Sequence, residues 1–322
     1  MYLFKKQTWL TAALLLTLTA CGGGGGDTVN TSTATTSVDV FDGAAIGCSV
    51  SSDGATATEV GEGAYTFASV LDAGTVVAAT GCTDTDTQSL LPTLSGVVQS
   101  GAVVISPITT LIVEAAIASD VAAKGANLPT SARSISPTAL ETAIAQIVTN
   151  LGLGDYKPTD PATANYVAAA KADTTGTSTA AVAMRISLAI STLLKSIEVS
   201  AGPANASAAV AAVSQAIVNS LSVVDLTQTT GIVAVMTAAQ TLAPAVATAI
   251  QTASDAIVTL VTLIINATGD ITLAIEVTTI IADFLNTADD TTITNPTTIK
   301  ALVTTVTPNC ALGTSALGGC KL

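Results

Sequence analysis

The chain contains no histidine in its 322 residues. This absence excludes a Ser-His-Asp or Cys-His nucleophile, a zinc ion held by histidine and an imidazole general base. No pair of carboxylates stands out as placed for acid–base chemistry, and sequence spacing alone would not show one. We therefore expect that the protein is not an enzyme, and we assign it no catalytic residue and no cofactor.

Basic and aromatic side chains are scarce as well. Lysine and arginine number 10 against 23 aspartate and glutamate residues, which gives a net charge of −13, and aromatic residues make up 3% of the chain. An acidic chain without a basic run does not hold a phosphate backbone, so nucleic acid is excluded as a partner. Hydrophobic residues nevertheless make up 49% of the chain, which is too many for a disordered tail. The length favours two domains.

The first twenty residues have the three parts of a secretory signal. Lys5 and Lys6 supply positive charge, Leu10 to Leu18 supply a short apolar stretch, and a cleavage site of small residues ends in Cys21. An ordinary signal peptide, with a chance cysteine after the cut, is one interpretation of this pattern.

The residues Leu18-Thr19-Ala20-Cys21 resemble the lipobox of bacterial lipoproteins. The resemblance implies that residues 1–20 are removed as a signal peptide and that Cys21 is lipidated, which anchors the mature chain to a membrane. Each buried CH₂ group contributes about 0.8 kcal/mol, so several acyl chains hold firmly where one would not. Removal of the signal takes two lysines away and leaves 8 basic against 23 acidic residues, a net charge of −15.

Residues 21–37 are expected to form a flexible tether. Gly22 to Gly26 is an unbroken glycine run, and a Thr/Ser-rich stretch follows it; such sequences favour no single conformation. Glycine-rich leashes resemble those of lipoproteins displayed on the surface of Gram-negative cells, and Gly22 directly after the cysteine is similar to lipoproteins sorted to the outer membrane. We therefore expect a lipid-anchored protein of the cell envelope at the outer membrane, with periplasmic and surface-exposed display both open.

Four cysteines remain once Cys21 is assigned to lipid. An even number suits disulfides in an oxidising compartment, and three pairings are possible. We favour Cys48–Cys82 and Cys310–Cys320, because each pair joins residues of one segment. Four free thiols or a Cys₄ metal site are the alternatives, but no C-x-x-C spacing supports a metal site.

Residues 38–106 read as short strands separated by glycine turns, which predicts a small β-sandwich. The expected strands are residues 38–40, 55–60, 65–67, 75–79 and 103–105. The segments Asp42 to Val50 and Gly63 to Phe67 resemble the carboxypeptidase-regulatory-like β-domains of bacterial surface proteins, in which a "DG-x-x-x-GA-x-V" strand pair precedes a "G-x-Y-x-F" strand. Cys48 departs from that pattern. The resemblance implies a structural or adhesive module without catalysis.

Residues 107–322 change to a helical period. Apolar stripes at helical spacing fall within residues 140–151, 182–197, 210–224, 257–265 and 271–285. Thr138 and Glu141 have the spacing of a capping box, and Gly202-Pro203, Gly231 and Pro244 mark turns or kinks. The sequence thus predicts an α+β protein: a small N-terminal β-sandwich followed by a larger, Ala/Thr-rich, all-helical domain of six to eight helices, with a tail closed by Cys310 and Cys320.

The helices lack charge on their outer faces. No charged residue occurs between Glu198 and Asp225 or between Asp225 and Asp255. Three interpretations of these uncharged faces remain open. They are buried inside a compact bundle, they form a surface for self-association, or they insert into a membrane. The most apolar stretch, residues 256–267, is too short to span about 30 Å of hydrocarbon.

Asp84 and Asp86 are the remaining candidates for a binding site. Their oxygens suit calcium, but the segment lacks the glycine and the distal glutamate of an EF-hand loop, so solvated turn carboxylates are the favoured interpretation.

The sequence therefore predicts a structural or adhesive lipoprotein that acts through protein–protein contact or self-association. The alternative is a solute-binding lipoprotein that holds an apolar ligand between helices, although the helical part offers few aromatic side chains for a pocket.

Overall fold

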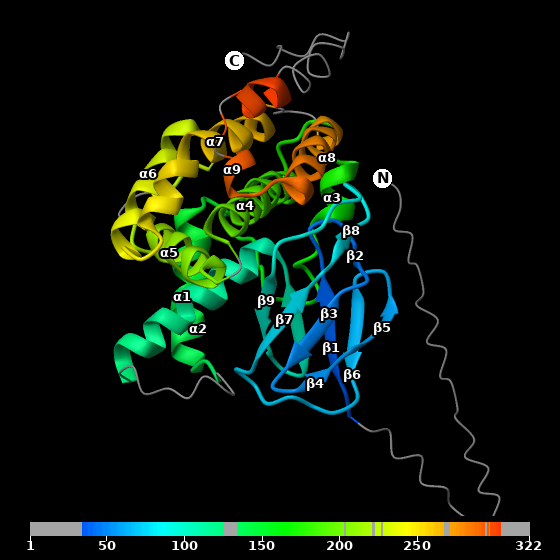
Figure 1. The fold of residues 1–322 in the computed structure, drawn as a ribbon. Coiled ribbons are helices and arrows are strands. Elements are labelled where there is room, and N and C mark those ends of the chain that lie inside the picture. Colours follow the sequence, from blue (N-terminus) through cyan, green and yellow to red (C-terminus); the bar gives the residue numbers. More distant parts are fainter. Residues whose placement is uncertain are drawn as a thin grey trace, which may run out of the picture. The chain divides into compact units, whose positions relative to one another are not determined.

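Strands fill the N-terminal part of the folded chain, and helices follow them (Figure 1). The computed structural model describes residues 34–124, 134–202, 204–220, 223–226, 228–266, 271–293, 295 and 297–303. The signal, Cys21 and most of the expected tether lie outside these residues, as do Cys310 and Cys320. The α+β class predicted from the sequence is the class observed.

The strands form two four-stranded sheets and one two-stranded ladder. They are β1 (Thr36–Val40), β2 (Ala45–Ile46), β3 (Ser49–Ser52), β4 (Ala55–Thr56), β5 (Thr58–Gly61), β6 (Ala64–Phe67), β7 (Val76–Thr80), β8 (Thr83–Asp84), β9 (Leu94–Val97) and β10 (Ala102–Ile105). One sheet has the order β10-β1-β6-β5, the other has the order β4-β3-β7-β9, and β2 pairs with β8.

Strand β1 shows why these residues form a sheet. Its burial alternates, with Val38 and Val40 inside and Ser37 exposed, which is the period of a strand with one buried face. It pairs in parallel with β10, Val40 opposite Ile105, and antiparallel with β6. Buried side chains from both four-stranded sheets form one hydrophobic cluster.

All five segments expected to be strands contain strands, but β2, β3, β8 and β9 lie outside them. β3 is three serines around Val50, which gives no clear apolar alternation. β9 contains Gly96, and a glycine indicates a turn in the sequence. A Cβ on Gly96 would lie 2.2 Å from the carbonyl oxygen of Val104. Glycine is therefore required there so that β9 can approach β10 closely.

Helices dominate the described residues after residue 106. They are α1 (Pro107–Lys124), α2 (Pro137–Asn150), α3 (Val167–Ala172), α4 (Thr179–Ala201), α5 (Ala206–Val218), α6 (Thr229–Leu242), α7 (Ala247–Asn266), α8 (Ile271–Thr287) and α9 (Asp290–Ile293). The five expected apolar stripes fall on helices over most of their length, but Leu151 follows the end of α2 and Val224 lies beyond the end of α5; residues 221–222 lie outside the described residues. Gly202 follows the last residue of α4 with a positive φ of 70°, as expected for a helix stop, whereas Gly231 lies inside the first turn of α6.

The capping box predicted at Thr138 and Glu141 is wrong. Helix α2 begins two residues earlier, because Ser136 is its N-cap and Pro137 occupies the first helical position. The Ser136 hydroxyl accepts a hydrogen bond from the Ala139 amide at 3.3 Å. Proline's fixed φ suits the first helical position and requires no amide donor, so it sets the start of the helix. Thr138 therefore lies within the first turn.

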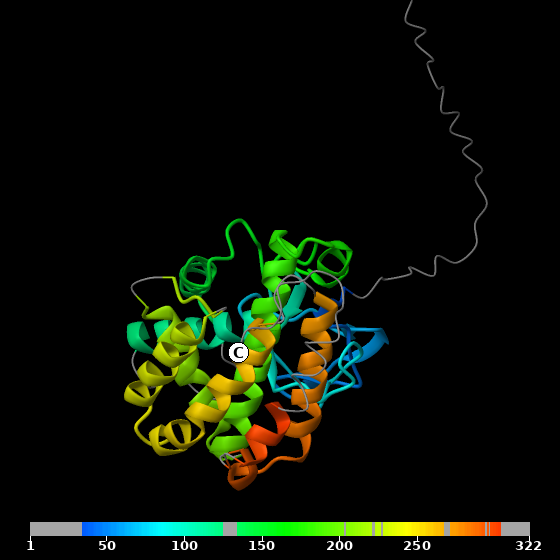
Figure 2. The same ribbon diagram turned by 90° about the horizontal axis from the view of Figure 1, so that it is seen from above.

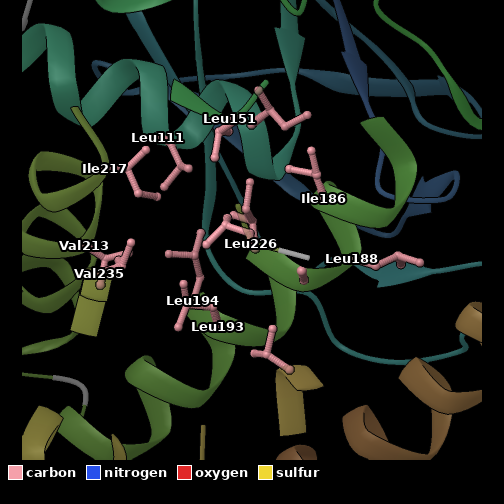
Figure 3. Packing of buried hydrophobic residues seen from close by; sticks show 14 of the residues in the cluster. Leu111, Leu151, Ile186, Leu188, Leu193, Leu194, Val213, Ile217, Leu226 and Val235 are labelled. Carbon is pink, nitrogen blue, oxygen red and sulfur yellow. The ribbon is translucent and has the colours of Figure 1, made fainter. Parts of the chain in front are cut away.

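Helix α4 is the centre of the helical part. It contacts α5, α7 and α8, and Figure 2 shows it running beside the last two. Its leucines and isoleucines pack with those of neighbouring helices (Figure 3). Helices α4 and α7 are long and apolar enough to cross a membrane by length and composition, but most of the α4 window is buried inside the protein, which is what a core helix requires.

The strands and helices pack against each other without a linker. The described residues from Ala34 onward form one compact unit, and α1 lies along β9. Two hydrogen bonds join them: Thr109 Oγ1 donates to the carbonyl of Ser95, and the Ser95 amide donates to Thr110 Oγ1, both at 2.9 Å. The expected boundary at residue 106 coincides with the change from strand to helix, whereas separate folding of residues 38–106 and 107–322 stays a prediction.

Candidate functional site

A disulfide joins Cys48 to Cys82, as favoured from the sequence. Cys48 precedes β3, Cys82 precedes β8, and their Cα atoms lie 4.2 Å apart. The bond therefore holds the start of one sheet strand beside the short β2–β8 ladder. The expected pairing of Cys310 with Cys320 and the lipidation of Cys21 lie outside the described residues and stay predictions.

Three aspartates gather where the strands meet helices α3 and α4. Asp42 and Gly43 form the turn between β1 and β2, and the pairing of Ala45 with Asp84 brings the end of β8 beside that turn. Asp42 and Asp84 are each only 1% exposed. A Cβ on Gly43 would lie 2.1 Å from Asp84 Oδ1 and 2.7 Å from Asp86 Oδ2. Glycine thus allows the turn to lie directly against both carboxylates.

The two carboxylates at the end of β8 and in the loop after it, Asp84 and Asp86, are held in different ways. Asp84 accepts hydrogen bonds from the Asp86 amide at 2.7 Å and from Thr87 Oγ1 at 3.0 Å. Asp86 pairs with the ammonium group of Lys171 on α3. The interpretation of Asp84 as a solvated turn carboxylate is therefore wrong, because the pairing of β2 with β8 and the turn at Gly43 bury it.

Helix α4 and the residue before α3 close the other side of this acidic cluster, defined as Asp42, Asp84 and Asp86. The side chains of Ser187 and Ser191 hydrogen-bond with the Asp42 carboxylate. Tyr166 donates its hydroxyl to Ser187 and lies edge-on against the ring of Phe41. The cluster is thus an internal junction between the strands and the helices.

Burial changes the acidity of these groups. Desolvation and the nearby charge of Asp84 raise the pKa of Asp42 from 3.8 to about 7, although the hydrogen bonds from Ser191 and Ser187 oppose the rise. Desolvation also raises the pKa of Asp84 and holds that of Tyr166 well above its ordinary value. Asp42 Oδ1 and Asp86 Oδ2 are buried without a hydrogen-bond partner. Such atoms are rare in folded proteins and require an explanation.

The geometry does not support a metal at this place. Among the described residues, no group of three or more His, Cys, Asp or Glu side chains is placed to hold a metal ion. Sequence reasoning noted Asp84 and Asp86 but missed Asp42, whose only signal was its place in the "DG" pair. The favoured Cys48–Cys82 pair indicates that the two segments lie near each other, but no motif indicates that the turn at Asp42 packs against residues 84–86.

A second feature is an uncharged surface on α5 and α6. Neither helix contains a charged residue, and Val233 and Leu242 of α6 are 44% and 40% exposed. A hollow of about 380 Å³ lies between these helices. We call this surface the α5/α6 face, and its hollow is lined by Ala216, Asn219, Ser220, Val224, Ala234, Val235, Ala238, Thr241 and Leu242.

A larger hollow of about 760 Å³ lies at the end of α4 and includes Thr93, Lys195 and Glu198. The Glu198 carboxylate accepts a hydrogen bond from the Thr93 amide at 2.9 Å. Desolvation raises the pKa of Glu198, although this hydrogen bond opposes the rise. This contact joins the loop before β9 to the helical part, so Glu198 has a structural role that accounts for its position.

A scan against protein-family models and searches of curated proteins and of solved structures return no match. The likeness to carboxypeptidase-regulatory-like domains therefore rests on the sequence motifs alone.

Proposed function

We propose that this chain is a lipid-anchored structural or adhesive protein of the cell envelope, held at the outer membrane through Cys21, which acts by contact between copies of itself. The α5/α6 face is the contact surface. The observation that carries the proposal is that this face combines exposed apolar side chains with a complete lack of charge in an otherwise acidic chain.

The net charge of the chain indicates that the partner at the α5/α6 face is a second copy of the same chain. Each mature chain, with 8 basic and 23 acidic residues from Cys21 onward, carries a net charge of −15, so two copies repel each other wherever their acidic surfaces approach. The α5/α6 face is a place where two copies can meet without burying an unpaired carboxylate, which is costly. Exposed charge normally discourages association, and this face has none.

The proposal also includes how the strands of residues 38–106 pack and what they do. We infer that the two four-stranded sheets pack as a β-sandwich, since one cluster of buried side chains draws on both, and that this module spaces the helical part from the anchor. The tether of residues 21–37 sets how far the folded part can extend from the membrane.

Light scattering of the full chain across a concentration series tests the proposal, with Cys21→Ser in every sample to prevent acylation. We expect a discrete oligomer or a mass that grows with concentration. Leu242→Glu places a like charge on both sides of the contact and should return the mass to that of a monomer.

Val60→Glu is the matched control. Val60 is 64% exposed on β5, so the same type of substitution there adds the same charge away from the α5/α6 face and should leave association unchanged. A monomer at all concentrations, or equal effects of the two substitutions, would contradict the proposal.

A second candidate function is the binding of an apolar solute. The α5/α6 hollow, at about 380 Å³, has a size at the lower end of the range for small-molecule pockets. The absence of aromatic residues from its lining weighs against this function. Native mass spectrometry of the purified chain would reveal a bound small molecule, and Ala238→Leu, which fills the hollow, should remove it.

A further inference from the structure

Three carboxylates lie together in the acidic cluster, but they have only one cationic partner among the described groups that contact them. Lys171 pairs with Asp86. Asp84 accepts its hydrogen bonds from an amide and a hydroxyl, and Asp42 is held by two serine hydroxyls. Two buried carboxylates close together do not both stay ionised without a compensating charge.

The groups that face Asp42 come from three elements. The end of β8 contributes Asp84, and the loop after it contributes Asp86. The segment leading into α3 contributes Tyr166, whose hydroxyl stays protonated because burial raises its pKa far above 10. Helix α4 contributes the neutral hydroxyls of Ser187 and Ser191. None of these groups neutralises a charge on Asp42, and its Oδ1 lies buried without a partner.

We propose that Asp42 binds a proton that holds the strands against helices α3 and α4, so that the acidic cluster is a pH-sensitive latch at this junction. With the proton bound, the cluster has one negative charge fewer, and the β1–β2 turn can lie buried against α4. As the pH rises, the proton leaves, and two ionised carboxylates, Asp42 and Asp84, face each other in a buried place.

The direction of the pH effect follows from linkage. The pKa of Asp42 is about 7 in the folded protein and 3.8 as its ordinary value, so the folded state holds a proton that the unfolded state has released. The stabilising contribution of the proton is complete below about pH 3.8, decreases as the pH rises toward 7, and is absent above that. One proton changes the folding equilibrium constant about tenfold per pH unit inside this window.

Urea unfolding of the full chain from pH 4 to pH 9 tests the latch, with Asp42→Asn as the variant and Asp283→Asn, an exposed position on α8, as the control. The ratio of the folding constants of the wild type and Asp42→Asn should fall about tenfold per pH unit up to about pH 7 and then level off. The control should follow the wild type at every pH. Parallel curves for the wild type and Asp42→Asn would overturn the proposal.

Asp84→Asn supplies an independent test that does not alter Asp42 itself. Because the charge of Asp84 raises the pKa of Asp42, the levelling-off point should move to lower pH in this variant. An unchanged point would contradict the dependence of the Asp42 proton on the charge of Asp84. A wild-type pH response that disappears when calcium is removed with EDTA would overturn the proposal and assign the site to a cation instead.

Hydrogen exchange shows which helices lose protection when Asp42 releases its proton. Protection of amides in α3 and in the α4 turns around Ser187 and Ser191 should decrease between pH 5 and pH 7, after correction for intrinsic rates, by more than protection in α6, which follows only the global folding constant. An equal decrease in α6 would show a global loss of stability and no latch.

Discussion

The ring of Phe41 meets the ring of Tyr166 edge-on, with their centroids 5.3 Å apart and their planes at 86°. Phe41 directly follows β1, and Tyr166 directly precedes α3. This edge-to-face geometry is favoured by the charge distribution of aromatic rings. It joins the strands and helices with an apolar contact beside the acidic cluster, in a chain that has very few aromatic residues.

Phe41→Ala should therefore lower the free energy of unfolding by about 3–5 kcal/mol, the usual effect of removing a buried phenylalanine. Tyr166→Phe keeps the ring and removes only the hydroxyl that donates to Ser187, so it should lose about 1 kcal/mol. Urea unfolding measures both. Equal losses in the two variants would contradict the importance of the ring contact.

Gly43→Ala should destabilise the protein, because the new Cβ would lie 2.1 Å from Asp84 Oδ1. Backbone and loop must shift to make room, and a loss of about 1–3 kcal/mol is the usual cost of such overpacking. Gly61→Ala is the control, since its nearest neighbour to an added Cβ, Ala64 Cβ, lies at an ordinary 3.8 Å. Thermal unfolding should separate the two variants by several degrees.

Removal of the disulfide by Cys48→Ala with Cys82→Ala should cost about 3–4 kcal/mol. The bond closes a loop with a sequence separation of 34 residues, and the loss of chain entropy in the unfolded state gives this magnitude. Unfolding of the wild type in the presence of a reductant should match the double variant. A wild type that is insensitive to reductant would show that the bond contributes little.

Glu198→Gln should alter the pH dependence of stability at the end of α4. Burial raises the pKa of Glu198 above 4.5, so the folded state holds its proton more tightly than the unfolded state does. The stabilising contribution of that proton is complete below 4.5 and is lost as the pH rises through the raised pKa. The wild type should therefore lose stability relative to Glu198→Gln across this range, as measured by thermal unfolding at a series of pH values.

The sequence predicted the elements whose side chains alternate clearly. Val38 and Val40 predicted β1, and the apolar period of residues 182–197 predicted α4, because burial on one face imposes a period that a single chain displays. The sequence could not predict β3, because its serines give no alternation of apolar and polar side chains. The start of α2 was misplaced because two capping patterns overlap within a few residues, and proline decided between them.

The acidic cluster could not be predicted for a different reason. Asp42 and Asp84 lie far apart in the chain, and the pairing of the two-residue strands β2 and β8 brings them together beside the Cys48–Cys82 disulfide. Strands of that length carry no period. The favoured cysteine pair indicated that the two segments lie near each other, but it did not indicate that Asp42 meets Asp84. The α5/α6 face was visible as a lack of charge, but the hollow in it depends on helix packing that composition does not specify.

The position of β1 has a mechanical consequence. Any tension that arrives through the residues before Ala34 enters the folded protein at β1, which is the strand closest to the expected anchor. β1 is not an edge strand, because it is hydrogen-bonded to β10 on one side and to β6 on the other. A pull along it must shear both ladders at the same time instead of opening one bond after another, so the fold resists load at the end where a tethered protein receives it.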